Sequence, residues 1–245
     1  MSGERRRPWL RVVAVASVGA IAVAACLPAS VTTQGRAVND LWNAFLVPAI
    51  VVATIVWGLT TYAIVRYRRR GAAADQLPPQ FSEDRRFEIA WTVIPIVTVL
   101  VLFGLTVSAL GRIDAHTDGG IDVEITAFRW QWRIDYPADG VTVFGLPEAP
   151  AEMVVPVGEP VHVTLSSPDV IHSFYVPLFL FKRDATPGRP TEFEFTVEEA
   201  GAYGGQCAEF CGVGHAAMKL TVRAVSRADY EAWLVQRRAA AGGAT

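Results

Sequence analysis

The sequence predicts a two-helix transmembrane hairpin, followed by an all-β sandwich or barrel and a short C-terminal helix. Three observations lead to this fold class: two long apolar runs without charge, strand-like alternation farther along the chain, and a change in charge balance between the two parts. Of the 245 residues, 51% are hydrophobic and 19% are charged, which is too apolar for a disordered chain or an ordinary soluble domain. Residues 1–112 hold 12 basic and 6 acidic residues, whereas residues 113–245 hold 10 and 18. The acidic second part argues against nucleic acid as a partner.

The first segment has the pattern of an export signal. Four arginines precede an uncharged apolar run of 14 residues, 12–25, which is too short to span a bilayer comfortably. Small residues then precede Cys26, an arrangement that resembles the lipobox of bacterial lipoproteins. We therefore expect residues 1–25 to be a lipoprotein-type signal peptide and Cys26 to be acylated. An uncleaved signal anchor with a cysteine placed by chance is the alternative.

Two longer apolar runs follow, 41–65 and 89–111, with 25 and 23 residues and no charge. At a rise of 1.5 Å per residue, either run can cross a hydrocarbon core of about 30 Å. We expect transmembrane helices over about 41–66 and 88–111, within a hairpin of residues 38–112.

The arginines predict the orientation of this hairpin. Six of them lie in the loop between the two runs, whereas only Arg36 lies in the segment just before the first run. The positive-inside rule therefore places the loop in the cytoplasm. We expect a multi-pass protein of the bacterial plasma membrane, with everything after residue 111 on the extracytoplasmic side.

Residues 113–225 have the pattern of an all-β domain. Apolar and polar residues alternate in three segments, which are 121–126, 161–165 and 192–197. Turn signals rich in Pro and Gly separate the expected strands, at 137–140, 156–158, 187–188 and 204–205. Short strands spaced in this way are typical of a sandwich or barrel. Ser226 and Asp229 then form a helix-start pattern, which predicts a C-terminal helix and tail over 226–245.

The residues that carry chemistry lie in one segment with the pattern C-x-E-x-C-x-x-x-H-x-x-M. Its thiols, imidazole and thioether are those of Cys207, Cys211, His215 and Met218. Thiolate with thioether favours copper over magnesium or calcium, and a methionine is unusual for zinc. A mononuclear blue-copper site uses one cysteine, whereas two thiolates can bridge two copper ions. Each ion then needs one histidine and one weak ligand. A disulfide is the alternative, but it does not account for the imidazole and the thioether.

A second histidine must come from elsewhere in the domain. His172 is the best candidate, because it begins a probable strand. His162 alternates with valines and is interpreted as a surface or core residue, and His116 is given no ligand role. A closed set of protein ligands leaves no position for a substrate, so the chain is expected to carry electrons and to have no catalytic residue. Neither apolar run contains a histidine, so neither run can ligate haem.

The chain resembles subunit II of the haem-copper cytochrome c oxidases over about residues 38–225. The cysteine motif, with a D-x-x-H pattern that ends at His172, carries the resemblance. It implies a cupredoxin-like β-barrel with a binuclear CuA centre of two copper ions. In this family the two thiolates bridge both ions, His172 and Met218 complete one ion, and His215 and the backbone carbonyl of Glu209 complete the other. The Glu209 side chain is implied to help hold a magnesium ion shared with subunit I.

Two further segments match the family. In the segment F-R-W-Q-W, Trp130 is implied to receive the electron from cytochrome c, and Trp132 is interpreted as a core residue. Phe128 and Gln131 depart from the family pattern there. Glu88 precedes a tryptophan at the start of the second apolar run and is implied to lie at the mouth of a proton channel. An ordinary interfacial glutamate is the alternative.

The resemblance implies a subunit II of a proton-translocating cytochrome c oxidase. Its CuA centre would accept electrons from cytochrome c and pass them to haem in subunit I, where oxygen is reduced to water with proton pumping. The expected partners are the haem-bearing subunit I, other oxidase subunits, the membrane, and a cytochrome c-type donor that acidic residues would steer, namely Asp135, Asp139 and Asp169. Three alternatives are a quinol oxidase subunit II-like protein, a copper chaperone and a stand-alone redox carrier. A chaperone would favour Met- and His-rich loops, but the chain has 3 Met and 4 His.

Overall fold

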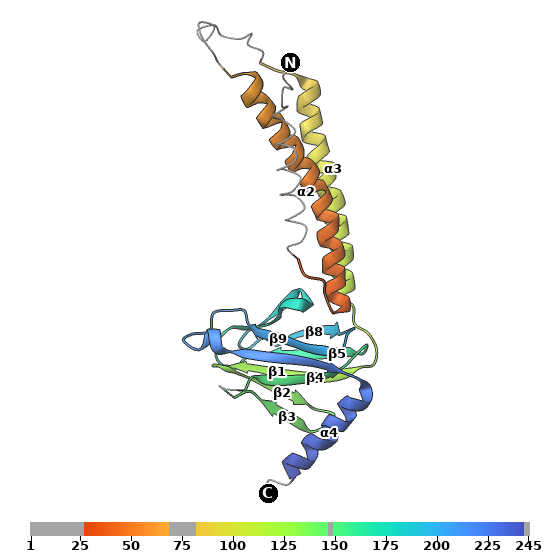
Figure 1. Cartoon of the computed structure of the whole chain (residues 1–245), viewed down its shortest axis with the longest axis vertical. Coiled ribbons are helices and arrows are strands. Elements are labelled where there is room, and N and C mark those ends of the chain that lie inside the picture. Colours follow the sequence, from red (N-terminus) through yellow and green to blue (C-terminus); the bar gives the residue numbers. More distant parts are fainter. Residues whose placement is uncertain (1–26, 69–81, 147–148, 243–245) are drawn as a thin grey trace, which may run out of the picture. The chain divides into compact units, whose positions relative to one another are not determined.

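The computed structural model describes residues 27–68, 82–146 and 149–242 (Figure 1). The described chain forms two compact units, one of which contains Asp40–Ser108. The other combines Ala29–Asn39 with the chain from Ala109 onward. The expected signal peptide and the acylation of Cys26 lie outside the described residues.

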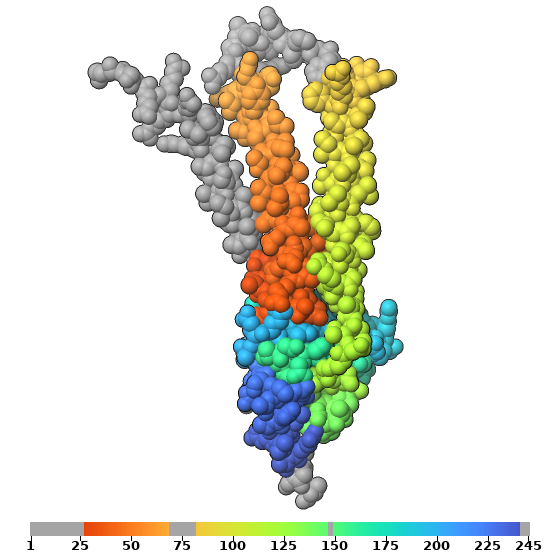
Figure 2. Space-filling model, turned by 90° about the vertical axis from the view of Figure 1, so that its right-hand side faces the viewer, coloured from red at the N-terminus to blue at the C-terminus, as the bar shows by residue number. Residues whose placement is uncertain are grey.

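Two long helices, α2 (Thr33–Arg66) and α3 (Arg85–Ile113), match the predicted hairpin. Both are long and apolar enough to cross a membrane. Their apolar side chains are exposed along the helices, and Figure 2 shows one face of each (orange and yellow). Such exposure distinguishes them from the core helices of a soluble protein, whose apolar faces are buried.

Helix α2 begins eight residues before the predicted position at residue 41. The hydroxyl Oγ1 of Thr32 accepts a hydrogen bond from the amide N of Gly35 at 3.0 Å, which caps the helix. The first turns are polar, so apolar patterning alone placed the start too late. Helix α3 likewise starts earlier than residue 88, because the Asp84 carboxylate accepts a hydrogen bond from the amide N of Arg86 at 3.1 Å.

The β-unit is a sandwich of two five-stranded sheets, which confirms the predicted fold class. In the first sheet the strand order is β3-β2-β1-β5-β8, with bounds β1 Ile121–Phe128, β2 Gln131–Tyr136, β3 Val141–Phe144, β5 Pro160–Ser166 and β8 Thr191–Thr196. In the second the order is β4-β10-β9-β6-β7, with bounds β4 Ala151–Pro156, β6 His172–Val176, β7 Phe181–Ala185, β9 Gly201–Cys207 and β10 Lys219–Val225. Two short 3-10 helices, Pro177–Phe179 and His215–Ala217, interrupt the loops.

The core lies between the two sheets and follows the alternation of the strands. In β1, Val123, Ile125 and Ala127 are buried, while the residues between them are more exposed. Trp132 of β2 is fully buried, as expected for a core residue, and its ring meets Phe174 edge-on. The predicted turn at 204–205 is wrong.

Gly204 and Gly205 lie inside β9, where they pair with β10. A Cβ atom on Gly205 would approach side-chain carbons of Leu220 and Val176 to 3.0 Å. This glycine therefore serves close packing between neighbouring strands, which is the other common reason for a glycine within a strand.

Helix α4 (Arg227–Gly242) follows the last strand, as predicted. Ser226 caps it, because its Oγ accepts a hydrogen bond from the amide N of Asp229 at 3.1 Å. Tyr230 and Trp233 of the helix pack on Tyr136 of β2. The helix therefore extends the core of the β-unit.

Residues 29–39, here called the N-terminal strap, belong to the β-unit although they precede both long helices. Thr32 forms an isolated antiparallel bridge with Val197, just after β8. The side-chain Oε1 of Gln34 accepts a hydrogen bond from the amide N of Thr196 at 3.0 Å. The β-unit is thus built from two stretches of chain separated by the hairpin.

Candidate metal centre

The predicted donor residues meet at one end of the second sheet. His172 is the first residue of β6 and Cys207 is the last of β9, and these antiparallel strands pair at Phe174 and Cys207. The loop after β9 returns to the same place, because the amide N of Cys207 donates to the carbonyl O of Met218 at 3.0 Å. Strand pairing therefore joins residues that are 35 positions apart in sequence.

Each of the five donor side chains lies within 3.9 Å of at least one other member of the set. The two sulfur atoms of Cys207 and Cys211 are 3.8 Å apart. The Sγ of Cys207 lies 3.8 Å from Nδ1 of His172. The Sγ of Cys211 lies 3.5 Å from Nδ1 of His215 and 3.9 Å from Sδ of Met218. The sequence therefore predicted a set of residues that the fold brings together.

The two cysteines are buried and free. Their sulfur separation of 3.8 Å far exceeds the roughly 2.05 Å of a disulfide bond. Two thiolates that share one metal ion through bonds of about 2.3 Å can lie at most about 4.6 Å apart. The spacing therefore fits a shared metal ion, and so does a donor set of thiolate, imidazole and thioether.

Asp169 orients the imidazole of His172. Its Oδ1 lies 2.9 Å from Nε2 of His172, which leaves Nδ1 directed at Cys207. Partial burial opposes ionisation of this carboxyl, but hydrogen bonds from His172 and from the amides of Arg129 and Val170 hold its pKa well below the usual range. An ionised carboxylate that accepts from the far nitrogen of a ligand histidine is the usual support for metal-bound imidazole. The D-x-x-H spacing is the sequence signal for this contact.

Burial, and the neighbouring Cys207 thiol, raise the pKa of Cys211 to about 12. The metal-free thiol of Cys211 is therefore protonated at neutral pH. Only the thiolate binds a metal ion, so occupation of the site must release this proton.

Glu209 presents its two ends to different surroundings. Its backbone carbonyl O lies 3.2 Å from Sγ of Cys207, inside the donor cluster. Its half-exposed carboxylate is 2.6 Å from Nζ of Lys182, on β7. This carboxylate raises the pKa of Lys182. The backbone and the side chain of one residue are thus available for separate roles.

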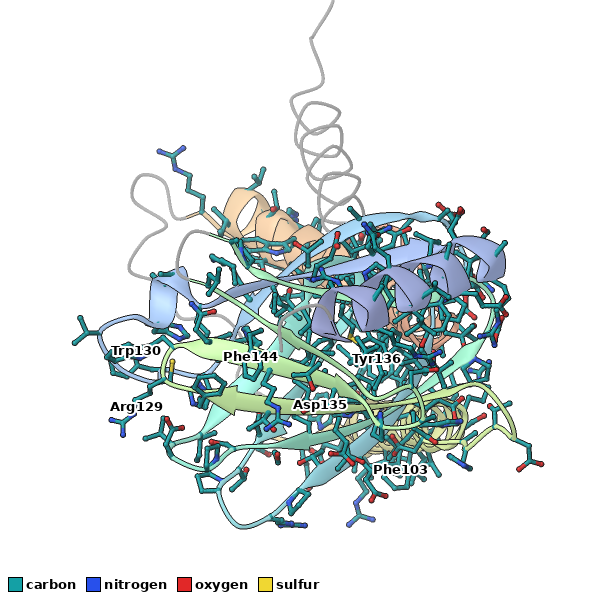
Figure 3. The ribbon with its side chains drawn as sticks, turned by 90° about the horizontal axis from the view of Figure 1, so that it is seen from below. Phe103, Arg129, Trp130, Asp135, Tyr136 and Phe144 are labelled. Atoms are coloured by element: carbon teal, nitrogen blue, oxygen red, sulfur yellow. The ribbon has the colours of Figure 1, made fainter. Side chains whose placement is uncertain are left out.

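Trp130 connects the solvent to the donor cluster. It lies in the turn between β1 and β2 and is 36% exposed. Its indole Nε1 donates a hydrogen bond to the carbonyl O of Cys211 at 3.0 Å. In Figure 3, Arg129 and Trp130 lie at one end of this strand pair, whereas Asp135 and Tyr136 lie farther along β2.

Each of the three aspartates expected to steer a donor contacts an arginine. Asp135 pairs with Arg133 at 2.8 Å, Asp139 pairs with Arg238, and Asp169 pairs with Arg129 at 3.3 Å. Of the three, Asp169 lies beside the Trp130 turn, because it also accepts from the amide N of Arg129 at 2.8 Å.

Sequence reasoning missed two exposed apolar residues in the loop between β9 and β10, which carries most of the candidate metal ligands. Phe210 is 81% exposed and Val213 is 97% exposed, and both lie between Cys207 and His215. Their position among the candidate metal ligands is the only feature of the sequence that could have drawn attention to them. Glu88 lies in the first turn of α3 and is half-buried.

A β-sandwich that gathers two thiols, two imidazoles and a thioether, joined to two membrane-length helices, defines a membrane-anchored protein with a cupredoxin-like metal-binding domain. Two family models match the chain, "Cytochrome C oxidase subunit II, transmembrane domain" over residues 20–108 and "Cytochrome C oxidase subunit II, periplasmic domain" over residues 139–225. "Cytochrome c oxidase subunit 2" of Cereibacter sphaeroides is 31% identical over 229 residues, which cover 80% of this chain and 75% of that protein. This chain belongs to the cytochrome c oxidase subunit II family, as the cysteine motif predicted.

Another relative and a solved structure are also similar to this chain. "Probable cytochrome c oxidase subunit 2" of Nocardia farcinica is 29% identical over 278 residues, which cover 86% of this chain and 74% of that protein. A crystal structure of the periplasmic domain of subunit II of cytochrome oxidase from Bradyrhizobium japonicum is 31% identical, covers 51% of this chain and 96% of that chain, and has a TM-score of 0.46. The family implies a CuA copper centre, and the cluster of His172, Cys207 and Cys211 fits it.

Proposed function

We propose that this subunit II accepts electrons from a cytochrome c-type donor at a binuclear CuA centre and passes them to haem in subunit I. The observation that carries the proposal is the convergence of two thiols, two imidazoles and a thioether, with sulfur and nitrogen neighbours 3.5–3.9 Å apart. When bound, the copper pair supplies a one-electron carrier whose charge is spread over two thiolates.

The chain's own residues would hold this centre in the way the family pattern implies. Cys207 and Cys211 would bridge the ions, and the remaining positions would be taken by His172, Met218, His215 and the backbone carbonyl of Glu209. The two cysteines and His172 are at most 4% exposed, so they exclude water. Burial of this kind also favours a resident centre over a copper chaperone, which must release its metal to a partner.

The metal content of the purified full-length chain tests this proposal. We expect two copper ions per chain, and we expect Met218→Leu to change the optical spectrum of the copper. Met153→Leu is the matched control, because Met153 is buried in β4 and has no place among the donors. A single copper ion with a blue-copper absorption band would contradict the proposal.

The donor would transfer its electron through Trp130. The exposed ring is joined to the backbone of Cys211 by one hydrogen bond, which gives a short route from the surface to a bridging thiolate. For docking, the three aspartates remain a prediction, although each is already paired with an arginine. We propose that the apolar tip formed by Phe210 and Val213 contributes more, because it lies between metal ligands and is exposed.

The assembly of the β-unit from two stretches of chain supports the proposed membrane arrangement. The N-terminal strap and the chain after residue 109 belong to one unit, so both must lie on the same side of the membrane. The chain between them therefore crosses an even number of times, which supports two crossings by α2 and α3. The arginine-rich loop then supports a cytoplasmic hairpin tip and an extracytoplasmic β-unit.

Three roles of single residues stay proposals. Glu209 would help hold a magnesium ion with subunit I, in which case the cation would replace Lys182 as the partner of the carboxylate. Glu88, at the start of α3, would lie at the mouth of a proton channel in the pumping complex. Cys26 would carry a lipid after removal of residues 1–25.

A further inference from the structure

A second group of metal-binding side chains lies on the first sheet, away from the cysteines. His162 of β5 and Glu194 of β8 are register partners on neighbouring strands. His116 comes from the segment between α3 and β1, and the centroid of its ring lies 4.5 Å from the ring centroid of His162. One nitrogen of each histidine and a carboxylate oxygen of Glu194 all lie within 4.8 Å of one another.

The hydrogen bonds of His162 determine which of its nitrogens is free. Its Nε2 lies 2.6 Å from the carbonyl O of Gly119, which can only accept, so Nε2 carries the proton. In the neutral ring Nδ1 then has a lone pair. This Nδ1 is buried and makes no hydrogen bond with any of the described residues, yet it lies 3.2 Å from Oε2 of Glu194. Two groups that can only accept thus face each other.

Such an arrangement requires a positive charge between the two atoms, either a proton on Nδ1 or a metal ion. The Glu194 side chain is 6% exposed, and a buried carboxylate is costly without a cationic partner. Among the described residues, the ion pairs of Glu194 involve His116 and His162 alone. Among the described residues, therefore, no lysine or arginine neutralises the Glu194 carboxylate.

The spacing matches the ligand shell of a small divalent cation. Two nitrogen or oxygen ligands at about 2.0–2.1 Å from a tetrahedral zinc ion lie about 3.3–3.4 Å apart. The observed separations from Oε2 of Glu194 are 3.2 Å to Nδ1 of His162 and 3.6 Å to Nδ1 of His116. The contact from Nε2 of His162 to a backbone carbonyl is the usual support of a metal-bound imidazole.

We propose that His116, His162 and Glu194 form a second metal site, which binds a borderline divalent cation such as Zn²⁺. Two imidazoles and one carboxylate are a ligand set that zinc uses in proteins, with a fourth position left to water. The His116 side chain is 75% exposed and the three residues line an open pocket, so the ion can arrive from solvent. The bound ion would fix the segment between α3 and β1 on the first sheet, where the amide N of Thr117 already donates to Glu194 at 2.9 Å.

Zinc binding to the full-length, copper-loaded chain in detergent tests the proposal, with metal content measured after equilibrium dialysis against Zn²⁺. We expect one zinc ion per chain. His116→Ala removes a proposed ligand, so it should weaken zinc binding by at least about 100-fold. Loss of a residue that only supports a ligand already weakens metal binding by up to about 100-fold. His116 is largely exposed, so this change leaves the fold intact.

Glu192→Gln is the matched control, because Glu192 lines the same pocket but is not one of the three ligands. It should change zinc affinity by less than about fivefold, since solvent and salt screen an exposed charge. Equal effects of the two substitutions would mean general attraction by an acidic pocket and would overturn the site. Absence of zinc binding, or binding unchanged by His116→Ala, would also overturn it and leave a simple imidazolium–carboxylate pair. Copper content is counted in the same samples, so a failure of the proposed copper centre is seen separately.

Discussion

Asp169 links two parts of the proposed copper centre through a single carboxylate. One oxygen holds Nε2 of His172 at 2.9 Å, and the other accepts from the amide N of Arg129 at 2.8 Å, next to Trp130. Its local hydrogen bonds therefore fix both a ligand histidine and the turn that carries the tryptophan.

We expect Asp169→Asn to lower copper affinity by roughly 10–100-fold, as the loss of a partner of a ligand histidine usually does. The measurement is a competition titration with a copper chelator. Asp135→Asn is the matched control, because Asp135 also pairs with an arginine but contacts no donor residue in the described structure. If both variants bind copper equally well, Asp169 does not support the site.

Gly214 controls the position of Trp130. A Cβ atom on Gly214 would come within 2.6 Å of ring carbons of this tryptophan, which real structures do not allow. Gly214→Ala should therefore displace the ring and slow electron acceptance from the donor, although the tryptophan itself is retained.

Stopped-flow reduction of the copper centre in the assembled oxidase measures this rate. Gly204→Ala is the control, since nothing lies within 4 Å of a Cβ atom placed there. Trp130→Ala should show the same slowing with nearly unchanged donor affinity. A normal rate in both variants would rule out the route through the indole.

At the scale of elements, the loop between β9 and β10 combines the proposed metal ligands with an apolar tip. Replacing Phe210 and Val213 by serine should raise KM for the cytochrome c donor by roughly tenfold, because a few residues near the centre of an interface usually carry most of the binding energy. Val235→Ser is the control, as Val235 is an exposed valine on α4.

The expected steering aspartates give the opposing prediction. Asp135→Asn with Asp139→Asn should change KM and its salt dependence little, because each carboxylate is already paired with an arginine. Asp169 is left unchanged in this test because it also holds His172. A strong, salt-sensitive effect of the two aspartates with none from Phe210 and Val213 would favour electrostatic docking.

Elements with a clear periodic signal could be predicted from the sequence. Strands β1 and β5 alternate cleanly, and both long helices contain uncharged runs. Strand β4 was not recognised, because four successive residues from Met153 are buried and no alternation remains. The start of α2 was missed for the opposite reason, since its first turns are polar and pack on the β-unit.

The two proposed metal sites also differ in how far the sequence alone could reveal them. Most donors of the cysteine centre lie within residues 207–218, so their spacing alone indicated copper. His116, His162 and Glu194 are distributed over three distant segments and become neighbours through the pairing of β5 with β8. Only a knowledge of that register could have joined them.

At the scale of the whole molecule, two buried tyrosines make the fold sensitive to alkali. Burial raises the pKa of Tyr136 far above its ordinary value of 10 and raises the pKa of Tyr230 to about 12. The folded state therefore keeps protons that the unfolded chain loses above pH 10. The protonated tyrosines make their full contribution to the free energy of unfolding below pH 10. This contribution falls as the pH rises, by at most about 1.4 kcal/mol per pH unit for each tyrosine.

We expect the melting temperature of the full-length chain to fall between pH 10 and 12, and Tyr136→Phe to make this fall shallower. The same substitution should lower stability at pH 7 by about 1–3 kcal/mol, because the Tyr136 hydroxyl bonds both the amide N and the carbonyl O of Val154. Tyr175→Phe, which removes a hydroxyl that is not fully buried, is the control. Identical alkaline slopes in all three proteins would contradict the assignment to Tyr136.

The N-terminal strap has a consequence for the timing of synthesis. Gln34 leaves the ribosome long before Thr196, whose amide it binds in the finished fold. At roughly 5–20 residues per second, this partner appears about 8–30 s later. Both hydrophobic helices are made during that interval, and in the proposed arrangement both then cross the bilayer, so that the strap and the strands lie in the same compartment. In that arrangement, a chain that inserts only one helix would leave the strap on the other side of the membrane from β8, and the β-unit could be completed only after both helices had inserted.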